Sequence, residues 1–400
     1  MLLETLRADG LLSFAPGSPE IPLRPLNVII GPNGSGKSNL IEIIELLRAT
    51  PTGLAAAIRD GGGVREWLWK GKGSAVGRLE ARLHRAGQGS LRYRLSFAAA
   101  GARTEIVDES IEEAEKTRPD GEDLEFYYRF SGGDAVLQAR PPSLNDRGSL
   151  DEAVWHRRVT LRRETLAADE SILSQRKEPE LYPELSWCAT QFSRIQTLRE
   201  WSFGRYTALR QPQPADLPTD VLLPDARNLG LFLHELEQGD AGPELNAMLR
   251  RFLPRFKRVG TRLEGNTVQV LLHEDGLTGP VPATRLSDGT LRFLAMTALL
   301  LVPRPPPLIC IEEPELGLHP DAMLLIAELL VAASARTQLV VTTHSDALVS
   351  ALTEHVDSVL VCDHRGGTEL TRLDADRLRH WLEQYRLGDV WRMGELGGNP

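Results

Sequence analysis

The feature that most constrains the fold is a phosphate-binding loop near the start of the chain. Residues 31–38 read GPNGSGKS, which matches the full pattern G-x-x-x-x-G-K-[S/T]. The apolar, β-branched run 26–30 precedes the loop, and the run 39–47 after it repeats apolar residues at helical spacing. A strand, a glycine loop and the start of a helix are the context in which this pattern binds phosphate. The pattern therefore predicts a nucleotide site rather than a chance glycine-rich turn.

Each part of this loop has an expected role. The glycines let successive backbone N–H groups point at phosphate oxygens, and the dipole of the following helix favours the negative charge. We expect Lys37 to reach the β- and γ-phosphates of ATP, and the Ser38 hydroxyl to hold Mg²⁺. The residues expected to surround the nucleotide here are Gly31, Pro32, Asn33, Gly34, Ser35, Gly36, Lys37, Ser38 and Asn39.

Two apolar runs far downstream deliver further polar groups to their ends. Run 308–311 leads into Glu312 and Glu313, and we assign Glu312 to the metal and Glu313 to an attacking water as general base. Run 338–342 leads to His344, whose imidazole can donate a hydrogen bond to the γ-phosphate. The alternatives are an acidic strand end and an ordinary loop histidine, and the phosphate loop favours the catalytic interpretation.

A fourth element, Leu286–Thr290, precedes the helical run 291–301. Serine and glycine before a helix can form an anion site at its N-terminus, which makes Ser287, Asp288 and Gly289 candidate nucleotide contacts. An ordinary capped helix explains the same residues when they are considered alone.

The alternation of elements indicates an α/β fold. Strand-like runs 308–311, 338–342 and 358–361 are separated by helical patterns at 322–335 and 345–353. This order predicts a parallel sheet with helices on both faces. The phosphate-loop strand is expected in the same sheet, so the middle of the chain is a long insertion.

Together the four elements resemble the ABC-type ATPase heads of the RecF and SMC branch, and more closely the OLD-like, AAA-21-type predicted ATPases. The resemblance covers the phosphate loop with Asn39, the signature at Leu286–Thr290, the strand end Ile311–Pro314, the loop Glu315–Pro320 and the switch Thr342–Ser345. It implies ATP and Mg²⁺ as cofactors and a homodimer in which two heads clamp two ATP molecules. Ser287 and Gly289 would then act in trans on the partner's γ-phosphate.

The sequence departs from transporters of this type at two positions. Glu312 stands where they have aspartate, and Asp288 stands where their signature has a second glycine. Both departures look like those of the OLD-like branch, and the family's glutamine loop is left unassigned.

The resemblance divides the chain into five segments of a P-loop NTPase head with an antiparallel β layer and an inserted helical subdomain. Strand-like alternation at 78–83 and 91–97 supports the β layer. The segments are 1–74 (first part of the head), 75–145 (antiparallel β layer), 146–260 (helical insertion), 261–365 (second part of the head) and 366–400 (C-terminal helix and docking tail).

Composition narrows the remaining possibilities. The net charge of -9 argues against a protein that coats nucleic acid through global charge. Three cysteines without metal-pair spacing indicate a reducing compartment. Charged residues within 1–10 exclude a secretory segment there, and the longest apolar run, 293–302, is too short to cross a bilayer. We expect a cytoplasmic protein without a membrane partner.

The segment after His344 bears on the output of the ATPase. OLD-family members carry a TOPRIM nuclease after the head, whereas only 56 residues (345–400) follow here. Asp374 and Asp376 fit a helix cap better than a metal site, so we expect no nuclease in this chain. Trp391 and Met393 lie among glycines, which predicts a docking peptide for an effector or, equally, a tail packed on its own head.

Two basic clusters are candidate DNA contacts. They span 155–163 and 250–262, and the second is interleaved with Phe252 and Phe256. On helices they could line a groove that follows phosphates. The alternative for each cluster is a solvated helix face with its aromatic residues in the core.

Three functions are therefore compared. The first is a regulatory ATPase subunit of a DNA-processing or anti-phage defence complex, acting with a separately encoded TOPRIM-like or other nuclease. A similar tail occurs in small predicted ATPases encoded beside such a protein. The second is a stand-alone, RecF-like DNA-binding repair or recombination ATPase. The third is an ATP-binding scaffold with negligible turnover.

Overall fold

The computed structural model describes the chain except for residues 74, 116–124, 140–156, 200–203, 205 and 398–400. The described chain forms two compact units. The first consists of Met1–Arg24, Gly31–Ile195 and Cys362–Thr371. The second consists of Pro25–Ile30, Gln196–Val361 and Arg372–Pro400.

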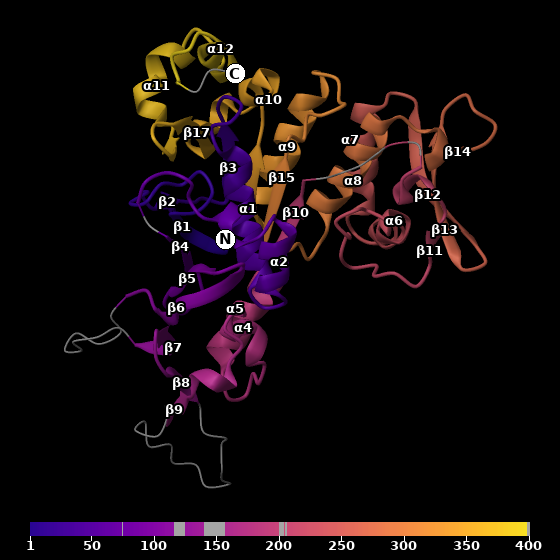
Figure 1. Ribbon diagram of the computed structural model, residues 1–400. Coiled ribbons are helices and arrows are strands. Elements are labelled where there is room, and N and C mark those ends of the chain that lie inside the picture. Colours follow the sequence, from indigo (N-terminus) through magenta and orange to yellow (C-terminus); the bar gives the residue numbers. More distant parts are fainter. Residues whose placement is uncertain (74, 116–124, 140–156, 200–203, 205, 398–400) are drawn as a thin grey trace. The chain divides into compact units, whose positions relative to one another are not determined.

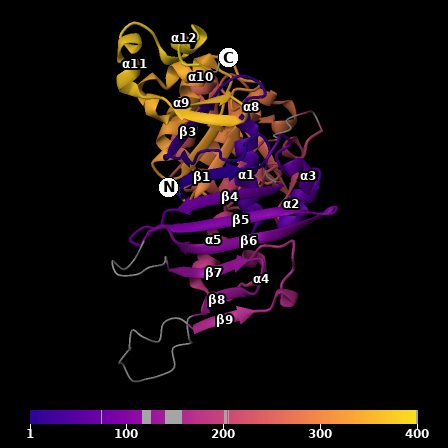
Figure 2. The same cartoon turned by 60° about the vertical axis from the view of Figure 1, so that its left-hand side comes forward.

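The first unit contains an eight-stranded antiparallel sheet, whose strands run side by side in Figure 2. Its order is β2-β1-β4-β5-β6-β7-β8-β9. Apolar and polar residues alternate along these strands: in β5, Tyr93 and Leu95 are buried while Arg92 and Arg94 lie on the other face. The strands are β1 (Leu3–Asp9), β2 (Ile21–Pro22), β4 (Val76–Leu83), β5 (Leu91–Ala100), β6 (Arg103–Glu113), β7 (Phe126–Ser131), β8 (Ala135–Ala139) and β9 (Arg157–Leu161). The predicted antiparallel layer is confirmed, and β1, β2 and β9 extend it beyond 75–145.

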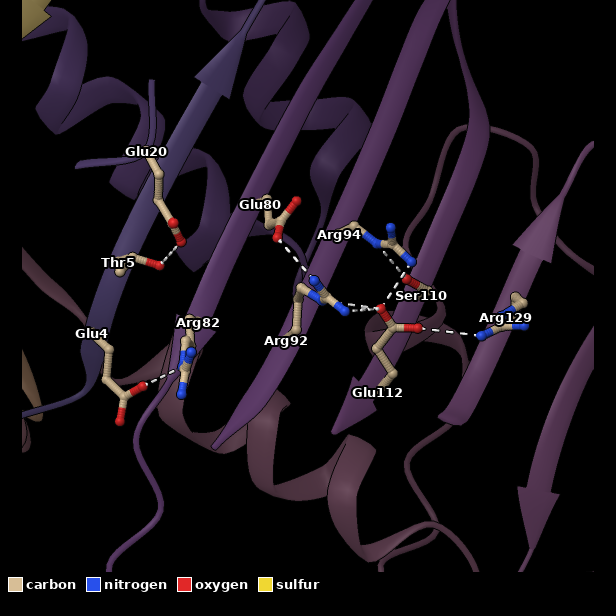
Figure 3. A network of polar contacts seen from close by, with 10 residues as sticks. All are labelled: Glu4, Thr5, Glu20, Glu80, Arg82, Arg92, Arg94, Ser110, Glu112 and Arg129. Atoms are coloured by element: carbon tan, nitrogen blue, oxygen red, sulfur yellow. Dashed lines mark hydrogen bonds and ion pairs between the residues drawn. The ribbon is translucent and has the colours of Figure 1, made fainter. Parts of the chain in front are cut away.

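The polar face of this sheet carries a network centred on Glu112, shown in Figure 3. The buried Glu112 carboxylate accepts hydrogen bonds from Arg92 at 3.0 Å and Arg94 at 2.9 Å on β5, and from Arg129 at 3.3 Å on β7. Arg92 also lies 3.8 Å from Glu80 on β4. Because one carboxylate is bonded across three neighbouring strands, it helps to fix their register.

The helices of the first unit begin with α1, directly after the phosphate loop. The buried face of α1 includes Leu40, Ile44 and Leu47 and packs against α2 and α5. The helices are α1 (Lys37–Ala49), α2 (Leu54–Asp60), α3 (Val64–Trp67), η2 (Arg163–Thr165), α4 (Ile172–Gln175) and α5 (Pro183–Ser193).

The second unit is built around a sheet of order β10-β15-β16-β3-β17-β18, in which the neighbours from β10 to β17 pair in parallel. Strand β16 pairs Val341 with both Ile311 and Val28, so the carboxyl ends of β15, β16 and β3 share one edge. The strands are β3 (Leu26–Ile30), β10 (Gln196–Leu198), β15 (Leu308–Glu312), β16 (Gln338–Thr342), β17 (Val359–His364) and β18 (Thr368–Arg372), the last two crossing unit boundaries. The prediction that the phosphate-loop strand belongs to this parallel sheet is confirmed.

Helices and a smaller sheet complete this part of the second unit. Helices α6 and α7 lie beside the antiparallel strands β11–β14 in Figure 1, and α8 and α9 contribute to the apolar core. The elements are η3 (Ala208–Arg210), β11 (Gln213–Pro214), α6 (Leu229–Gln238), α7 (Gly242–Phe252), β12 (Phe256–Glu264), β13 (Thr267–Glu274), β14 (Val281–Pro282), η4 (Ala283–Arg285), α8 (Asp288–Leu301), α9 (Ala322–Ser334), α10 (Asp346–Ala351) and η5 (Thr353–Ser358). Segment 146–260, expected to be helical, contains α4–α7 but also strands β9–β11 and the start of β12.

The C-terminal segment forms α11 (Ala375–Leu382) and α12 (Leu387–Arg392) near α10 (Figure 1). Asp374 caps α11 by accepting from the Asp376 N–H at 2.9 Å, which confirms the predicted cap. Trp391 is 0% exposed and belongs to the apolar core, and Arg392 lies 3.2 Å from Asp346. Of the two alternatives for the tail, packing on its own head is therefore confirmed for Trp391, and presentation of this side chain to a partner is not.

Candidate functional site

The phosphate loop requires glycine at two places where the chain passes close to other backbone or side-chain atoms. Gly31 and Gly36 have φ angles of +147° and +108°. A Cβ atom on Gly31 would lie 2.2 Å from the Cys362 carbonyl oxygen, and one on Gly36 would lie 2.0 Å from Thr368 Oγ1. Both the conformation and the space therefore exclude larger residues.

Lys37 is buried and is the first residue of α1. Its Nζ donates to the carbonyl oxygens of Gly31 at 2.8 Å and Pro32 at 3.0 Å. The ammonium group therefore lies over the loop backbone, where a bound phosphate would find it. The Ser35 hydroxyl oxygen is buried with no hydrogen-bond partner among the described residues, as expected in a site that awaits a ligand.

The remaining loop residues differ in their surroundings. Ser38 is half-buried in the first turn of α1, whereas Asn33 and Gly34 are exposed. Asn39 donates from Nδ2 to Ser13 Oγ at 2.7 Å, so its side chain positions the loop on the first unit.

In the second unit the predicted carboxylates stand at the end of β15. Glu312 pairs in register with Thr342 and accepts a hydrogen bond from Arg199 Nε at 2.9 Å. Glu313 follows with a φ of +47°, a left-handed conformation that is uncommon for glutamate. His344 Nε2 lies 3.7 Å from a Glu313 carboxylate oxygen, so the two predicted catalytic residues come together.

A third carboxylate, Glu315, supports this pair. It accepts a hydrogen bond from the His344 backbone N–H at 2.7 Å, and burial raises the pKa of its carboxyl group. Its second oxygen and the Thr342 hydroxyl oxygen are buried without hydrogen-bond partners among the described residues. From the sequence, Glu315 was expected only as the first residue of the loop Glu315–Pro320, although the repeated acids in Glu-Glu-Pro-Glu indicate a further acidic group at the strand end.

The signature residues lie against the loop that follows these carboxylates. Ser287 caps α8 by accepting from the Thr290 N–H at 3.0 Å. A Cβ atom on Gly289 would lie 2.5 Å from the Gly317 carbonyl oxygen, so two of the predicted elements touch through backbone. One turn later, Arg292 Nη1 donates to the Glu313 carbonyl oxygen at 3.3 Å, and burial lowers the pKa of Arg292.

The donor groups present fit Mg²⁺, which prefers carboxylate and hydroxyl oxygens supplemented by water and phosphate. The Thr342 hydroxyl oxygen, which has no hydrogen-bond partner among the described residues, belongs to the register neighbour of Glu312, whose carboxylate pairs with Arg199. Among the described residues, no group of three or more acidic, histidine or cysteine side chains forms a closed metal site. Most of the coordination would therefore come from the nucleotide and from water.

Among the described residues, neither basic cluster forms a single helix face. In the first, Trp155 and His156 lie outside the described residues, Arg158 is on strand β9, and Arg163 stacks 4.6 Å from the Phe130 ring centroid. Because β8 and β9 pair in the sheet, the described part 157–161 of this cluster is extended, and Arg163 begins the short helix η2.

The second cluster passes from α7 into strand β12. Its aromatic residues are turned inward: Phe252 stacks on Phe293 with centroids 4.0 Å apart, and Phe256 is buried. Arg251 is held by Glu328 at 2.9 Å, while Arg250 and Lys257 are exposed. The expectation of one basic helix is wrong, and the placement of its aromatics in the core is confirmed.

A glycine loop follows a parallel strand, and two carboxylates and a histidine stand at neighbouring strand ends, which is the arrangement of a P-loop nucleotide-binding fold. The chain belongs to the AAA_21 family, described as "AAA domain, putative AbiEii toxin, Type IV TA system", whose model matches residues 26–350. No curated protein sequence matches the chain significantly. No helix among the described residues has both the length and the apolar character needed to span a bilayer.

Solved structures of SMC heads share the fold. An Smc head bound to the C-terminal winged-helix domain of ScpA matches with a TM-score of 0.58 and 14% identity over 95% of this chain and 100% of that one. A second match is an Smc head with an extended coiled coil, bound to the C-terminal domain of ScpA and derived from Pyrococcus furiosus. Its TM-score is 0.58 and its sequence identity 12%, over 96% of this chain and 99% of that chain. A Pyrococcus yayanosii Smc head matches with a TM-score of 0.51 and 12% identity over 96% of this chain and 99% of that chain.

Proposed function

We propose that this protein is a Mg²⁺-dependent ATPase that dimerises on ATP and thereby regulates a separately encoded effector of a DNA-processing or anti-phage defence complex. The observation that carries the ATPase part is the approach of His344 to Glu313, 3.7 Å apart at the end of a parallel sheet. Strand β3 ends at that same edge, and the phosphate loop follows it directly in the chain.

The proposed chemistry distributes roles among these groups. Lys37 binds the β- and γ-phosphates, and Ser38 and Glu312 hold Mg²⁺, which neutralises charge on the transferring phosphate. Glu313 takes a proton from the attacking water, while His344 contacts the γ-phosphate from the next strand. Ser287 and Gly289 complete the pocket of a second copy of the chain.

The effector part has its own support. An Smc head of this fold was solved bound to a ScpA domain, so a head of this architecture can carry a protein partner. On the C-terminal segment, Tyr385 and Met393 are 42% and 44% exposed and remain available for contact, although Trp391 is not. The OLD-like affiliation and a nuclease as the effector rest on the resemblance in sequence.

The test uses Glu313→Gln, which keeps size and polarity but removes the base. We expect hydrolysis to fall by about 10²-fold or more while ATP and Mg²⁺ convert the variant from monomer to dimer in light scattering. Lys37→Ala in the same background should bind no ATP and stay monomeric. A Glu313→Gln protein that remains monomeric at saturating ATP overturns the proposal. Equal, negligible turnover in the wild type and the variant favours the scaffold.

The RecF-like alternative is favoured by one observation, the exposed basic residues at the end of α7 and the start of β12. Arg251 is already paired with Glu328, so it is left unchanged in the test. The informative variant combines Arg250→Ala, Lys257→Ala and Arg258→Ala. If the chain alone is a DNA clamp, ATP-dependent binding to gapped duplex should weaken at least about tenfold in this variant, and its salt dependence should become shallower. Unchanged DNA affinity removes these residues from the function.

A further inference from the structure

The signature turn is a short extended link between two helices. Leu286 and Ser287 have ψ angles of 154° and 156°, after η4 ends at Arg285 and before α8 begins at Asp288. The Ala283 carbonyl oxygen accepts from the Leu286 N–H at 3.2 Å. The Leu286 carbonyl oxygen lies between the two helices, where a helical hydrogen bond does not reach it, so another group has to bond to it if the turn is to keep one geometry.

Arg210 provides that hold from a distant part of the chain. It is the last residue of η3 and is 5% exposed. Its Nη1 donates to the carbonyl oxygens of Ala283, at 3.0 Å, and Leu286, and its Nη2 donates to the Asp288 carboxylate. One guanidinium group therefore bonds to residues before, within and after the turn, a fork that lysine cannot reproduce.

A second contact is the close approach of Gly289 to the Gly317 carbonyl oxygen. With the Arg210 hydrogen bonds and this backbone contact, the first turn of α8 has little freedom to shift. Arg292, on the same helix, in turn contacts the backbone of Glu313.

Arg210 also compensates the negative charge of the Asp288 carboxylate. The Asp288 side chain is 63% exposed, in the segment that would face the triphosphate of a second copy. A free carboxylate there would repel the γ-phosphate, whereas an ion pair with a buried guanidinium removes much of that charge. This accounts for the tolerance of aspartate within the signature.

We propose that Arg210 is a positioning residue that shapes the signature turn and neutralises Asp288, so that the turn can receive the partner's ATP. The inference rests on the proposed ATP-dependent dimer. It predicts that Arg210 acts on dimerisation and leaves nucleotide binding at the chain's own phosphate loop unchanged.

The experiment compares Arg210→Gln with Arg227→Gln, a change at a solvent-exposed arginine of the same unit, both in the Glu313→Gln background. We expect the dimer dissociation constant with ATP to rise about tenfold or more only in the Arg210 variant, which corresponds to at least about 1.4 kcal/mol. Fluorescent-ATP affinity of the monomer should stay within about twofold of the parent. Adding Asp288→Asn to Arg210→Gln should recover part of the lost dimerisation, because the unpaired charge is gone.

Three outcomes overturn the inference. The first is a parent that dimerises and an Arg210→Gln variant that dimerises equally well. The second is loss of monomer ATP binding together with dimerisation. The third is a large drop in melting temperature in both Arg210→Gln and Arg210→Lys, which would assign the residue to folding alone. A parent that fails to dimerise instead overturns the proposed function, so the two failures are distinguishable.

Discussion

Arg199 Nε donates to a Glu312 carboxylate oxygen at 2.9 Å, so the carboxylate assigned to Mg²⁺ is already paired with a guanidinium group. Arg199 follows β10, the strand beside β15. A cation that binds at Glu312 must therefore compete with this arginine.

Replacing Arg199 should make Mg²⁺ binding easier. In Arg199→Gln we expect the Mg²⁺ concentration for half-maximal nucleotide binding to fall about fivefold, because a partly exposed ion pair contributes ~1 kcal/mol. Magnesium titration with a fluorescent ATP analogue measures the change, with Arg227→Gln as control. An unchanged or increased Mg²⁺ requirement would show that Arg199 does not oppose the cation.

Gly289 should tolerate no side chain. In Gly289→Ala the new Cβ would lie 2.5 Å from the Gly317 carbonyl oxygen, so backbone must move. We expect a loss of about 1–3 kcal/mol in the free energy of unfolding, as for other overpacked sites. Gly279→Ala is the matched control, since a Cβ atom there meets no atom within 4 Å. Equal denaturation midpoints for the two variants would contradict the contact.

As the pH rises from 4.5 to 7, ionisation of Glu109 on β6 should lower the free energy of unfolding. Its buried carboxyl group bonds Tyr93 Oη at 2.9 Å, the Ser171 hydroxyl and the Ile172 N–H at 3.0 Å, and burial raises its pKa from 4.5 to about 7. In this window the folded chain holds a proton that the unfolded chain has released. Raising the pH therefore favours unfolding, by on the order of 3 kcal/mol once both states are ionised.

Glu109→Gln isolates this contribution, because glutamine does not titrate. The variant should gain stability relative to wild type as the pH rises from 5 to 8, measured by urea denaturation at each pH. A difference between the two proteins that stays constant with pH would exclude Glu109 as the group responsible.

The tail should prove to be a structural part of the second unit. Trp391→Ala removes a fully buried indole and should cost about 3–5 kcal/mol of unfolding free energy, whereas Met393→Ala, at an exposed site, should change stability by less than about 0.5 kcal/mol. Calorimetry distinguishes the two. Similar melting temperatures for both variants would mean that the tail contributes no packing.

Local pattern was sufficient for strands β3, β15, β16 and β17 of the parallel sheet. The prediction 338–342 matches β16, and 322–335 nearly matches α9, because continuous apolar runs and helical periodicity are strong signals. The three-residue strand β10 is too short to show a period, so its place beside β15 was not foreseen.

Ion pairs between residues far apart in the chain could not be predicted from sequence patterns. Arg210 and Asp288 are 78 positions apart, and Arg251 and Glu328 are 77 apart, so no local pattern links either pair. The basic cluster at 250–262 was correctly seen as charged, but its secondary structure and its carboxylate partner depend on tertiary contacts.

The left-handed backbone at Glu313 lowers the stability of the fold at the residue that the proposed function uses as the base. A non-glycine residue in this conformation costs roughly 1–2 kcal/mol, which Gly or Asn would largely avoid. A laboratory selection for heat resistance alone should therefore favour glycine or asparagine in place of Glu313, the residue proposed as the base. Under the proposed function, the need for a base at this position is the reason to keep glutamate there.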